Sequence, residues 1–183
     1  MKTCTQDSQT METDPEVMAV ARTAFQHARA GETSQLEWLL AVGLPPNLTN
    51  ERGDTLLMLA SYHGYRETTR VLLERKADPE RLNDRGQTPL AGAAFKGNAA
   101  IARLLLDHGA RVDGAGPDGR TALMFAAMFD RLEMVELLLA QGAAPERTDA
   151  EGRTALDCAR AMGARRTEER LAKLQATRVF HAT

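Results

Sequence analysis

A period of 33 residues runs through the sequence and constrains its fold more than any other feature. Four residue types recur at this spacing, each in a series of four: Gly53, Gly86, Gly119 and Gly152; Thr55, Thr88, Thr121 and Thr154; Leu57, Leu90, Leu123 and Leu156; and Ala60, Ala93, Ala126 and Ala159. Apolar triplets keep the same step at 38–40, 71–73, 104–106 and 137–139. Self-similarity at a fixed period of this length indicates a solenoid of stacked units.

Each unit has the pattern of two short helices followed by a loop. In the unit from 83 to 115, Thr88 is expected to cap the first helix, and Pro89 occupies the first helical position, where its missing N–H costs nothing. Gly97 can end that helix in the left-handed conformation. Apolar residues at 101, 104 and 105 predict the second helix, which Gly109 ends. Turn-forming residues from 111 to 119 lead into the next unit.

These residues make the chain resemble the ankyrin repeat family, whose 33-residue unit opens with Gly-x-Thr-Pro-Leu and has a Gly between its helices. The segment from Gly86 to Leu90, Gly-Gln-Thr-Pro-Leu, matches this opening most closely. The resemblance covers about residues 18 to 174. It implies an all-α solenoid of stacked helix-turn-helix units with short β-hairpin-like loops.

The resemblance also divides the chain into segments. We expect a repeat domain at 15–175, with a cap at 15–49, units at 50–82, 83–115 and 116–148, and a second cap at 149–175. The segment from Pro15 to Ala30 predicts an amphipathic cap helix, and the last unit turns polar after Gly163. Polar outer faces on terminal repeats keep a solenoid soluble. Residues 1–14 are expected to be a disordered polar tail and residues 176–183 a C-terminal tail.

The chain departs from the family pattern in ways that predict local weakness. Leu56, Ala122 and Ala155 replace the Pro of the opening, and the His that usually follows it is Met58, Ala91, Met124 and Asp157. We therefore expect the side-chain hydrogen bonding of that His to be absent. Lys76 and Asp130 stand at two glycine positions. Because an L side chain disfavours the left-handed conformation, more so for Lys than for Asp, we expect the second and fourth units to be looser.

Composition restricts the class of function. The formal charge is −2, so the chain lacks the basic excess of a sequence-independent nucleic-acid binder. The first fifteen residues hold one Lys and no apolar run, and no window approaches 18 uninterrupted apolar residues. We therefore expect neither a secretory signal nor a membrane span. Cys4 and Cys158 are expected to be unpaired thiols, which suits a reducing compartment, and we predict a cytoplasmic protein.

In the ankyrin architecture, as the resemblance implies, the two residues before the inter-helix Gly face a concave groove. Here these pairs are Tyr62-His63, Phe95-Lys96, Met128-Phe129 and Ala161-Met162. Aromatic residues make up only 4% of the chain, yet three of the eight, Tyr62, Phe95 and Phe129, fall in these positions, where chance would place fewer than one. Such rings suit a protein-binding surface. The alternative is that they pack laterally between repeats, and the sequence leaves both interpretations open.

The resemblance places the loop tips at the rim of the groove. The rim residues are predicted to be Arg52, Asp54, Asp84, Arg85, Gln87, Asp118, Arg120 and Arg153, together with Glu51 and Glu151. Five of these are acidic and four are basic. This mixture favours a polar rim around an apolar groove over a phosphate-binding track.

No pattern indicates catalysis or a cofactor. The four histidines, His27, His63, His108 and His181, lie far apart and lack the spacing of zinc ligands. Cys158 takes a repeat position held elsewhere by Leu59 and Phe125, which suggests core packing. The glycine-rich stretch at 114–119 lacks the Lys-Ser/Thr of a phosphate-binding loop. We predict no metal site, no cofactor and no catalytic residues.

The sequence therefore predicts a non-enzymatic protein-binding module that acts as an adaptor, regulator or inhibitor. It resembles the small stand-alone ankyrin proteins of bacteria, and we expect a monomer that binds a protein partner, with no nucleic acid or membrane partner. Three alternatives stay open: a secreted effector that engages host proteins, a structural accessory that stabilises another protein, and an enzyme with an unrecognised site.

Overall fold

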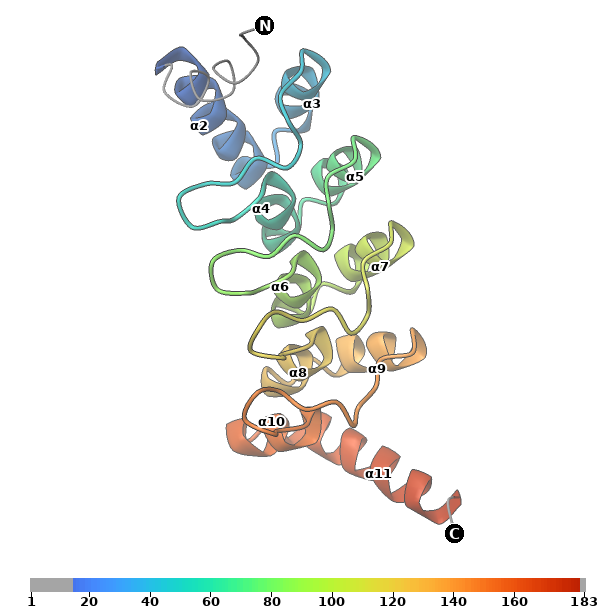
Figure 1. Cartoon of the computed structure of the whole chain (residues 1–183). Coiled ribbons are helices and arrows are strands. Elements are labelled where there is room, and N and C mark those ends of the chain that lie inside the picture. Colours follow the sequence, from blue (N-terminus) through green and yellow to red (C-terminus); the bar gives the residue numbers. More distant parts are fainter. Residues whose placement is uncertain (1–14, 182–183) are drawn as a thin grey trace, which may run out of the picture.

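The computed structural model describes residues 15–181, which form a stack of ten helices in five pairs (Figure 1). The pairs are α2 (Pro15–Ala30) and α3 (Thr33–Ala41), α4 (Leu56–His63) and α5 (Arg66–Glu74), α6 (Pro89–Lys96) and α7 (Ala99–Asp107), α8 (Ala122–Met128) and α9 (Leu132–Ala140), and α10 (Ala155–Met162) and α11 (Arg165–His181). Long loops that connect successive pairs project to one side of the stack. In this range the β pairing is a single isolated bridge between Thr49 and Thr55. The predicted all-α solenoid is confirmed.

A threonine starts each first helix of the second to fifth pairs. The hydroxyl oxygens of Thr55, Thr88, Thr121 and Thr154 accept hydrogen bonds from the backbone N–H three residues later, over 3.1, 3.1, 3.4 and 3.2 Å. Each bond satisfies one of the N–H groups that a helix start leaves unpaired. The cap predicted at Thr88 is therefore confirmed and recurs in each of these pairs.

Asp157 modifies the expectation that side-chain hydrogen bonding is lost at the family's His position. Its carboxylate accepts the backbone N–H of Thr154 at 3.0 Å and the Thr154 hydroxyl at 2.6 Å, completing a reciprocal capping box. These hydrogen bonds hold the pKa of Asp157 below its ordinary value. The expectation is wrong for this unit, because a short carboxylate supplies a local replacement for the missing imidazole.

Small residues allow the stacked helices to approach closely. Ala60, Ala93, Ala126 and Ala159 lie at equivalent positions of α4, α6, α8 and α10, and all four are fully buried. Leucines from both helices of the units, including Leu57, Leu72, Leu105 and Leu138, fill the space between them and are also inaccessible to solvent. Burying each such leucine contributes about 1.5–3 kcal/mol. The core is thus a continuous line of contacts between neighbours rather than one centre.

Gly116 permits a close backbone approach between two loops. A Cβ atom at this position would lie 2.1 Å from the carbonyl oxygen of Gly86 in the preceding unit. No side chain fits there, which explains why Gly116 stands where Asn50, Asn83 and Asp149 stand in the other loops.

The two glycine positions occupied by other residues do adopt the left-handed conformation. Lys76 has φ of 67° and Asp130 has φ of 53°. The Asp130 carboxylate also accepts the backbone N–H of Thr167 at 3.0 Å, and so helps to start α11 in the next unit. Lys76 has no such compensating contact among the described residues. The two positions therefore share the left-handed backbone but differ in the side-chain contact that accompanies it.

One end helix matches its predicted segment, and the other extends past it. The cap helix predicted from Pro15 to Ala30 is α2, whereas the boundary predicted at residue 175 falls inside α11, which continues to His181. No Gly or Pro follows Ala164, so nothing in the sequence stops the helix at 175. The tail predicted at 1–14 lies outside the described residues. None of the helices within 15–181 is long and apolar enough to cross a membrane.

Candidate functional site

Three aromatic rings connect successive units. The rings of Tyr62 and Phe95 are stacked with their centroids 6.1 Å apart, and Phe95 meets Phe129 edge to face at 4.4 Å. Phe95 and Phe129 are half-buried, while Tyr62 is 40% exposed. The lateral packing that the sequence left open is therefore present, and Tyr62 still offers surface to a partner. Such ring pairs contribute about 0.5–1.5 kcal/mol beyond their burial.

Two polar side chains of the predicted groove pairs lie around the Tyr62 ring. The Lys96 Nζ atom stands 4.6 Å from the ring centroid, within the range of a cation–π interaction. The His63 ring lies edge to face 5.5 Å away. Both residues are exposed. They support the outer end of the aromatic row.

A groove of about 1770 Å³ lies on the concave side, in the N-terminal half of the stack. Its floor includes Met58 and Tyr62 of α4 and Phe95 of α6. Residues of helix α2 line one part of it, called the α2 wall, and the loops between α3 and α4 and between α5 and α6 line another part, called the loop wall. Of the predicted site residues, those that line it are Tyr62, His63, Phe95, Glu51, Arg52, Asp54, Arg85 and Gln87.

The other predicted site residues do not line this groove. They are Lys96, Met128, Phe129, Ala161, Met162, Asp84, Asp118, Arg120, Glu151 and Arg153. Met128 is half-buried against the core, while Met162 is 53% exposed near the C-terminal end. The predicted site residues are therefore divided between those that line this groove and those that lie outside it.

Helix α2 also lines the groove, which the repeat pattern does not predict. Met18, Ala21, Arg22, Phe25 and Arg29 of this helix line the groove. Their spacing of three or four residues places them on one helix face, which is a detectable pattern. The 33-residue pattern does not include this helix face, because α2 has 16 residues where the equivalent helices of the later units have seven or eight.

An Asn or Asp side chain shapes three of the loop tips in the same way. The Oδ1 atom of Asn50 accepts the N–H groups of Arg52 and Asp54 at 2.9 and 3.0 Å. Asn83 does the same for Arg85 and Gln87 at 3.1 and 3.0 Å, and Asp149 for Glu151 and Arg153 at 3.0 and 2.9 Å. These turns fix the backbone from which the rim side chains project.

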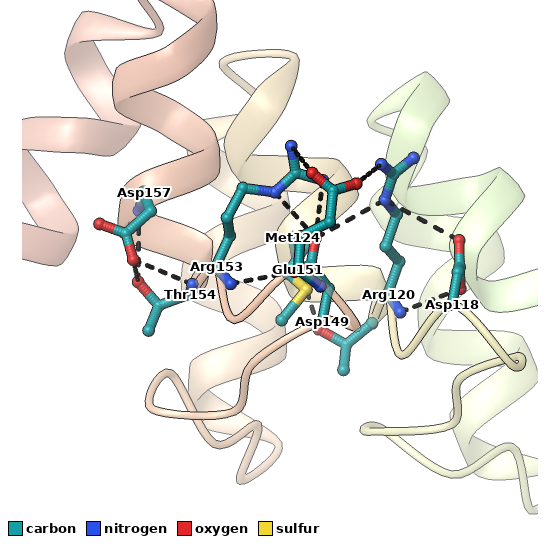
Figure 2. Close-up of polar contacts among 9 residues, drawn as sticks. Asp118, Arg120, Met124, Asp149, Glu151, Arg153, Thr154 and Asp157 are labelled. Atoms are coloured by element: carbon teal, nitrogen blue, oxygen red, sulfur yellow. Dashed lines mark hydrogen bonds and ion pairs between the residues drawn. The ribbon is translucent and has the colours of Figure 1, made fainter.

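Asp149 is the centre of an ion-pair network at the C-terminal loop tips (Figure 2). Its carboxylate, 1% exposed, accepts hydrogen bonds from Arg153 Nε at 3.0 Å and Nη2 at 2.8 Å, and Arg120 Nε lies 3.8 Å away. Glu151 pairs with both arginines, at 2.9 and 3.6 Å, and Asp118 lies 3.8 Å from Arg120. Burial alone would raise the pKa of Asp149, but the hydrogen bonds from Arg153 and Glu151 lower it below its ordinary value.

The loop tips of the second and third units carry no such network. Asp54 accepts a hydrogen bond from Asn83 Nδ2 at 2.8 Å, and so takes part in neutral bonding. Arg52 and Arg85 are exposed and make no ion pair with any described residue. The rim arginines therefore form internal ion pairs at the C-terminal end, whereas those at the N-terminal end have no ion-pair partner among the described residues.

Three side chains of types that often act in catalysis are buried or hydrogen-bonded within the fold. Cys158 is buried, and burial raises the pKa of its thiol, which disfavours the reactive thiolate. The His108 Nδ1 atom lies 2.9 Å from the Leu104 carbonyl, and His27 pairs with Glu32. In the described part of the chain, no group of three or more His, Cys, Asp or Glu side chains is arranged to hold a metal ion.

Comparison with known proteins agrees with this architecture. A family model described as ankyrin repeats in three copies matches residues 24–115, and one described as ankyrin repeats in many copies matches residues 105–159. An ankyrin repeat protein of Pseudomonas aeruginosa is 53% identical over 65 residues, which are 36% of this chain and 38% of that protein. The matched part thus spans little more than a third of the relative's length. Ankyrin repeats generally serve as protein–protein interaction modules without enzymatic activity. The chain belongs to the ankyrin repeat family.

Proposed function

We propose that this chain is a non-enzymatic module that binds a segment of a partner protein in its concave groove and acts as an adaptor, regulator or inhibitor. The observation that carries the proposal is the groove of about 1770 Å³ between α2 and the loops before α4 and α6. A hollow of this length suits a stretch of polypeptide, because it extends over three units.

The side chains of the groove have the composition of a protein interface. Tyr62 on the floor and Met18 and Val20 on the α2 wall are 40%, 44% and 43% exposed, although apolar residues usually seek burial. Arginines and amides surround them. Aromatic and Met anchors inside a polar, Arg-rich rim are typical of interface centres.

Site-specific cross-linking tests the proposal. The photoreactive residue benzoylphenylalanine replaces Arg85, in the groove wall, or Arg103, exposed on α7 away from the groove. Irradiation in the native cell extract should give a discrete cross-linked protein, identifiable by mass spectrometry, from position 85 and not from position 103. Equal products from both positions, or none from either, would contradict binding in the groove.

A variant of the floor provides the second test. Tyr62→Ala with Phe95→Ala should keep the helical circular dichroism spectrum and lose the cross-link from position 85. Because Phe95 also packs against Phe129, the single change Tyr62→Ala serves if the double variant unfolds. A folded variant that still gives the full cross-link would remove these rings from the site.

The proposal includes a monomer in the cytoplasm. Light scattering over a range of concentrations separates a monomeric binder from a structural accessory that assembles with itself. Fractionation of the native cells tests the location, and recovery from the culture medium would favour the alternative of a secreted effector.

A further inference from the structure

The groove has a local charge that the whole chain does not predict. Five arginines line it: Arg22, Arg29, Arg52, Arg81 and Arg85. Its carboxylates are Glu51 and Asp54. The lining therefore has a formal excess of three positive charges in a chain whose net charge is −2. This excess is a property of one surface.

None of these five arginines forms an ion pair with a described residue. Elsewhere in the described part, seven arginines do: Arg70, Arg75, Arg111, Arg120, Arg153, Arg160 and Arg170. All five groove arginines are exposed, so their guanidinium groups can meet a ligand without first breaking an internal pair. A partner's carboxylates would supply the missing counter-charges.

The arginines stand on both walls of the groove. Arg22 and Arg29 are seven residues apart on α2, which is two turns or about 10 Å along the helix. Arg52 and Arg85 project from equivalent turns of successive loops in the loop wall, one unit apart. A ligand that contacts α2 and these loops thus meets cations from both.

The floor distinguishes a peptide from a nucleic acid. Tyr62 already packs against Phe95 and Lys96, and Phe95 against Phe129, so these rings are not free platforms for stacking a series of bases. The exposed apolar lining other than Tyr62 is not aromatic and comes from Met18, Val20 and Val42, which are 44%, 43% and 63% exposed. Such a surface fits the apolar side chains of a polypeptide.

We propose, as a refinement that rests on the proposed function, that the groove selects an acidic peptide segment with interspersed apolar residues. Its carboxylates bind the arginines of α2 and of the two loops, and its apolar side chains contact Tyr62, Met18 and Val20. Electrostatic complementarity of this kind raises the association rate and sets specificity.

Fluorescence anisotropy with defined peptides tests the refinement. The probe is a fluorescein-labelled peptide of repeating Glu-Leu-Asp, and its uncharged match is repeating Gln-Leu-Asn. The protein should bind the acidic peptide at least about tenfold more tightly at low salt, and added salt should remove most of the difference. Equal binding of the two peptides, or binding of neither, overturns acidic selection.

Matched arginine variants locate the effect. Arg52→Gln with Arg85→Gln should weaken binding of the acidic peptide about fivefold or more, as expected for two exposed charge pairs. Arg66→Gln with Arg103→Gln removes the same charge from exposed, unpaired arginines outside the groove and should change affinity less than twofold or so. Equal weakening by the two variants would mean general attraction and would overturn the assigned site.

A single-stranded oligouridylate of similar length is the third probe. Tighter binding of this RNA than of the acidic peptide would overturn the choice of partner class. A specific cross-link from position 85 without preference for the acidic peptide would leave the proposed groove function intact and remove only the charge selection. Loss of both results would remove both proposals.

Discussion

The loop tips in the two halves of the solenoid share one backbone turn and carry opposite charges at equivalent positions. Arg52 and Arg85 in the N-terminal half correspond to Asp118 and Glu151 in the C-terminal half. Two residues later, Asp54 and Gln87 correspond to Arg120 and Arg153. In the C-terminal half the two charge positions pair with each other and with Asp149, whereas in the N-terminal half the arginines stay unpaired.

The difference separates what the turn does from what the charges do. Asn50, Asn83 and Asp149 hold the turn with the same two hydrogen bonds. Asp149 adds a charge, which draws both neighbouring arginines into an internal network. The same loop position can therefore carry a residue that joins the internal network at one end of the stack and, two units earlier, an arginine without an ion-pair partner among the described residues.

The largest expected effect comes from removing the buried acceptor of the paired half. Asp149→Ala leaves two backbone N–H groups and Arg153 without their partner and should lower the free energy of unfolding by about 3 kcal/mol. Asn83→Ala removes the same turn without a charge and should cost about 1–2 kcal/mol. Urea unfolding followed by circular dichroism measures both. Equal losses would show that the charge of Asp149 adds nothing to the turn.

A smaller effect isolates that charge. Asp149→Asn keeps the turn acceptor, as Asn50 and Asn83 do, and should cost about 1 kcal/mol at neutral pH. The pKa of Asp149 lies below its ordinary value in the folded protein, so its stabilisation is present above the ordinary pKa of about 4 and is lost as pH falls through the folded pKa. The stability difference between wild type and Asp149→Asn should therefore shrink in acid. A difference independent of pH would exclude the carboxylate charge as its cause.

The sequence predicts the fold, but it does not predict how the charged residues pair at the two ends of the rim. The 33-residue period and the Thr caps depend on contacts within a unit or between adjacent units, so position alone predicts them. The pairing of Arg120 with Asp149 and Glu151 depends on how two loops approach in space. The total of five acidic and four basic rim residues does not show which of them form ion pairs. In the structure, Arg120 and Arg153 pair with acidic residues, whereas Arg52 and Arg85 do not pair with any described residue.

The sequence predicts those groove residues that belong to the repeat pattern. Tyr62 and Phe95 follow from the repeat register, and the structure places both on the floor. Phe129 does not line the groove, because its ring packs against Phe95. The α2 wall was missed because that helix lies outside the repeat pattern and is about twice as long as its equivalents.

A second comparison concerns Lys76 and Asp130, the two residues other than glycine that have a left-handed backbone in the described part of the chain. Lys76→Gly should raise the free energy of unfolding by about 1 kcal/mol, because it relieves a strained backbone without loss of a described contact. Asp130→Gly relieves similar strain but removes the acceptor of the Thr167 N–H, so its net effect should be near zero or destabilising. Thermal unfolding of the two variants gives the comparison. Equal stabilisation would show that the Asp130 hydrogen bond contributes little.

The smallest expected effect tests most directly whether the N-terminal rim arginines contribute to the stability of the fold. Arg52→Gln with Arg85→Gln removes two arginines that have no ion-pair partner among the described residues, so the free energy of unfolding should change by less than about 0.5 kcal/mol. Arg120→Gln with Arg153→Gln removes the cations that surround a buried carboxylate and should destabilise the protein measurably under the same conditions. Residues retained for binding need not stabilise the fold, whereas those that hold its end must. Equal stability losses in the two variants would mean that the N-terminal arginines also support the fold, and the distinction between the two halves of the rim would fail.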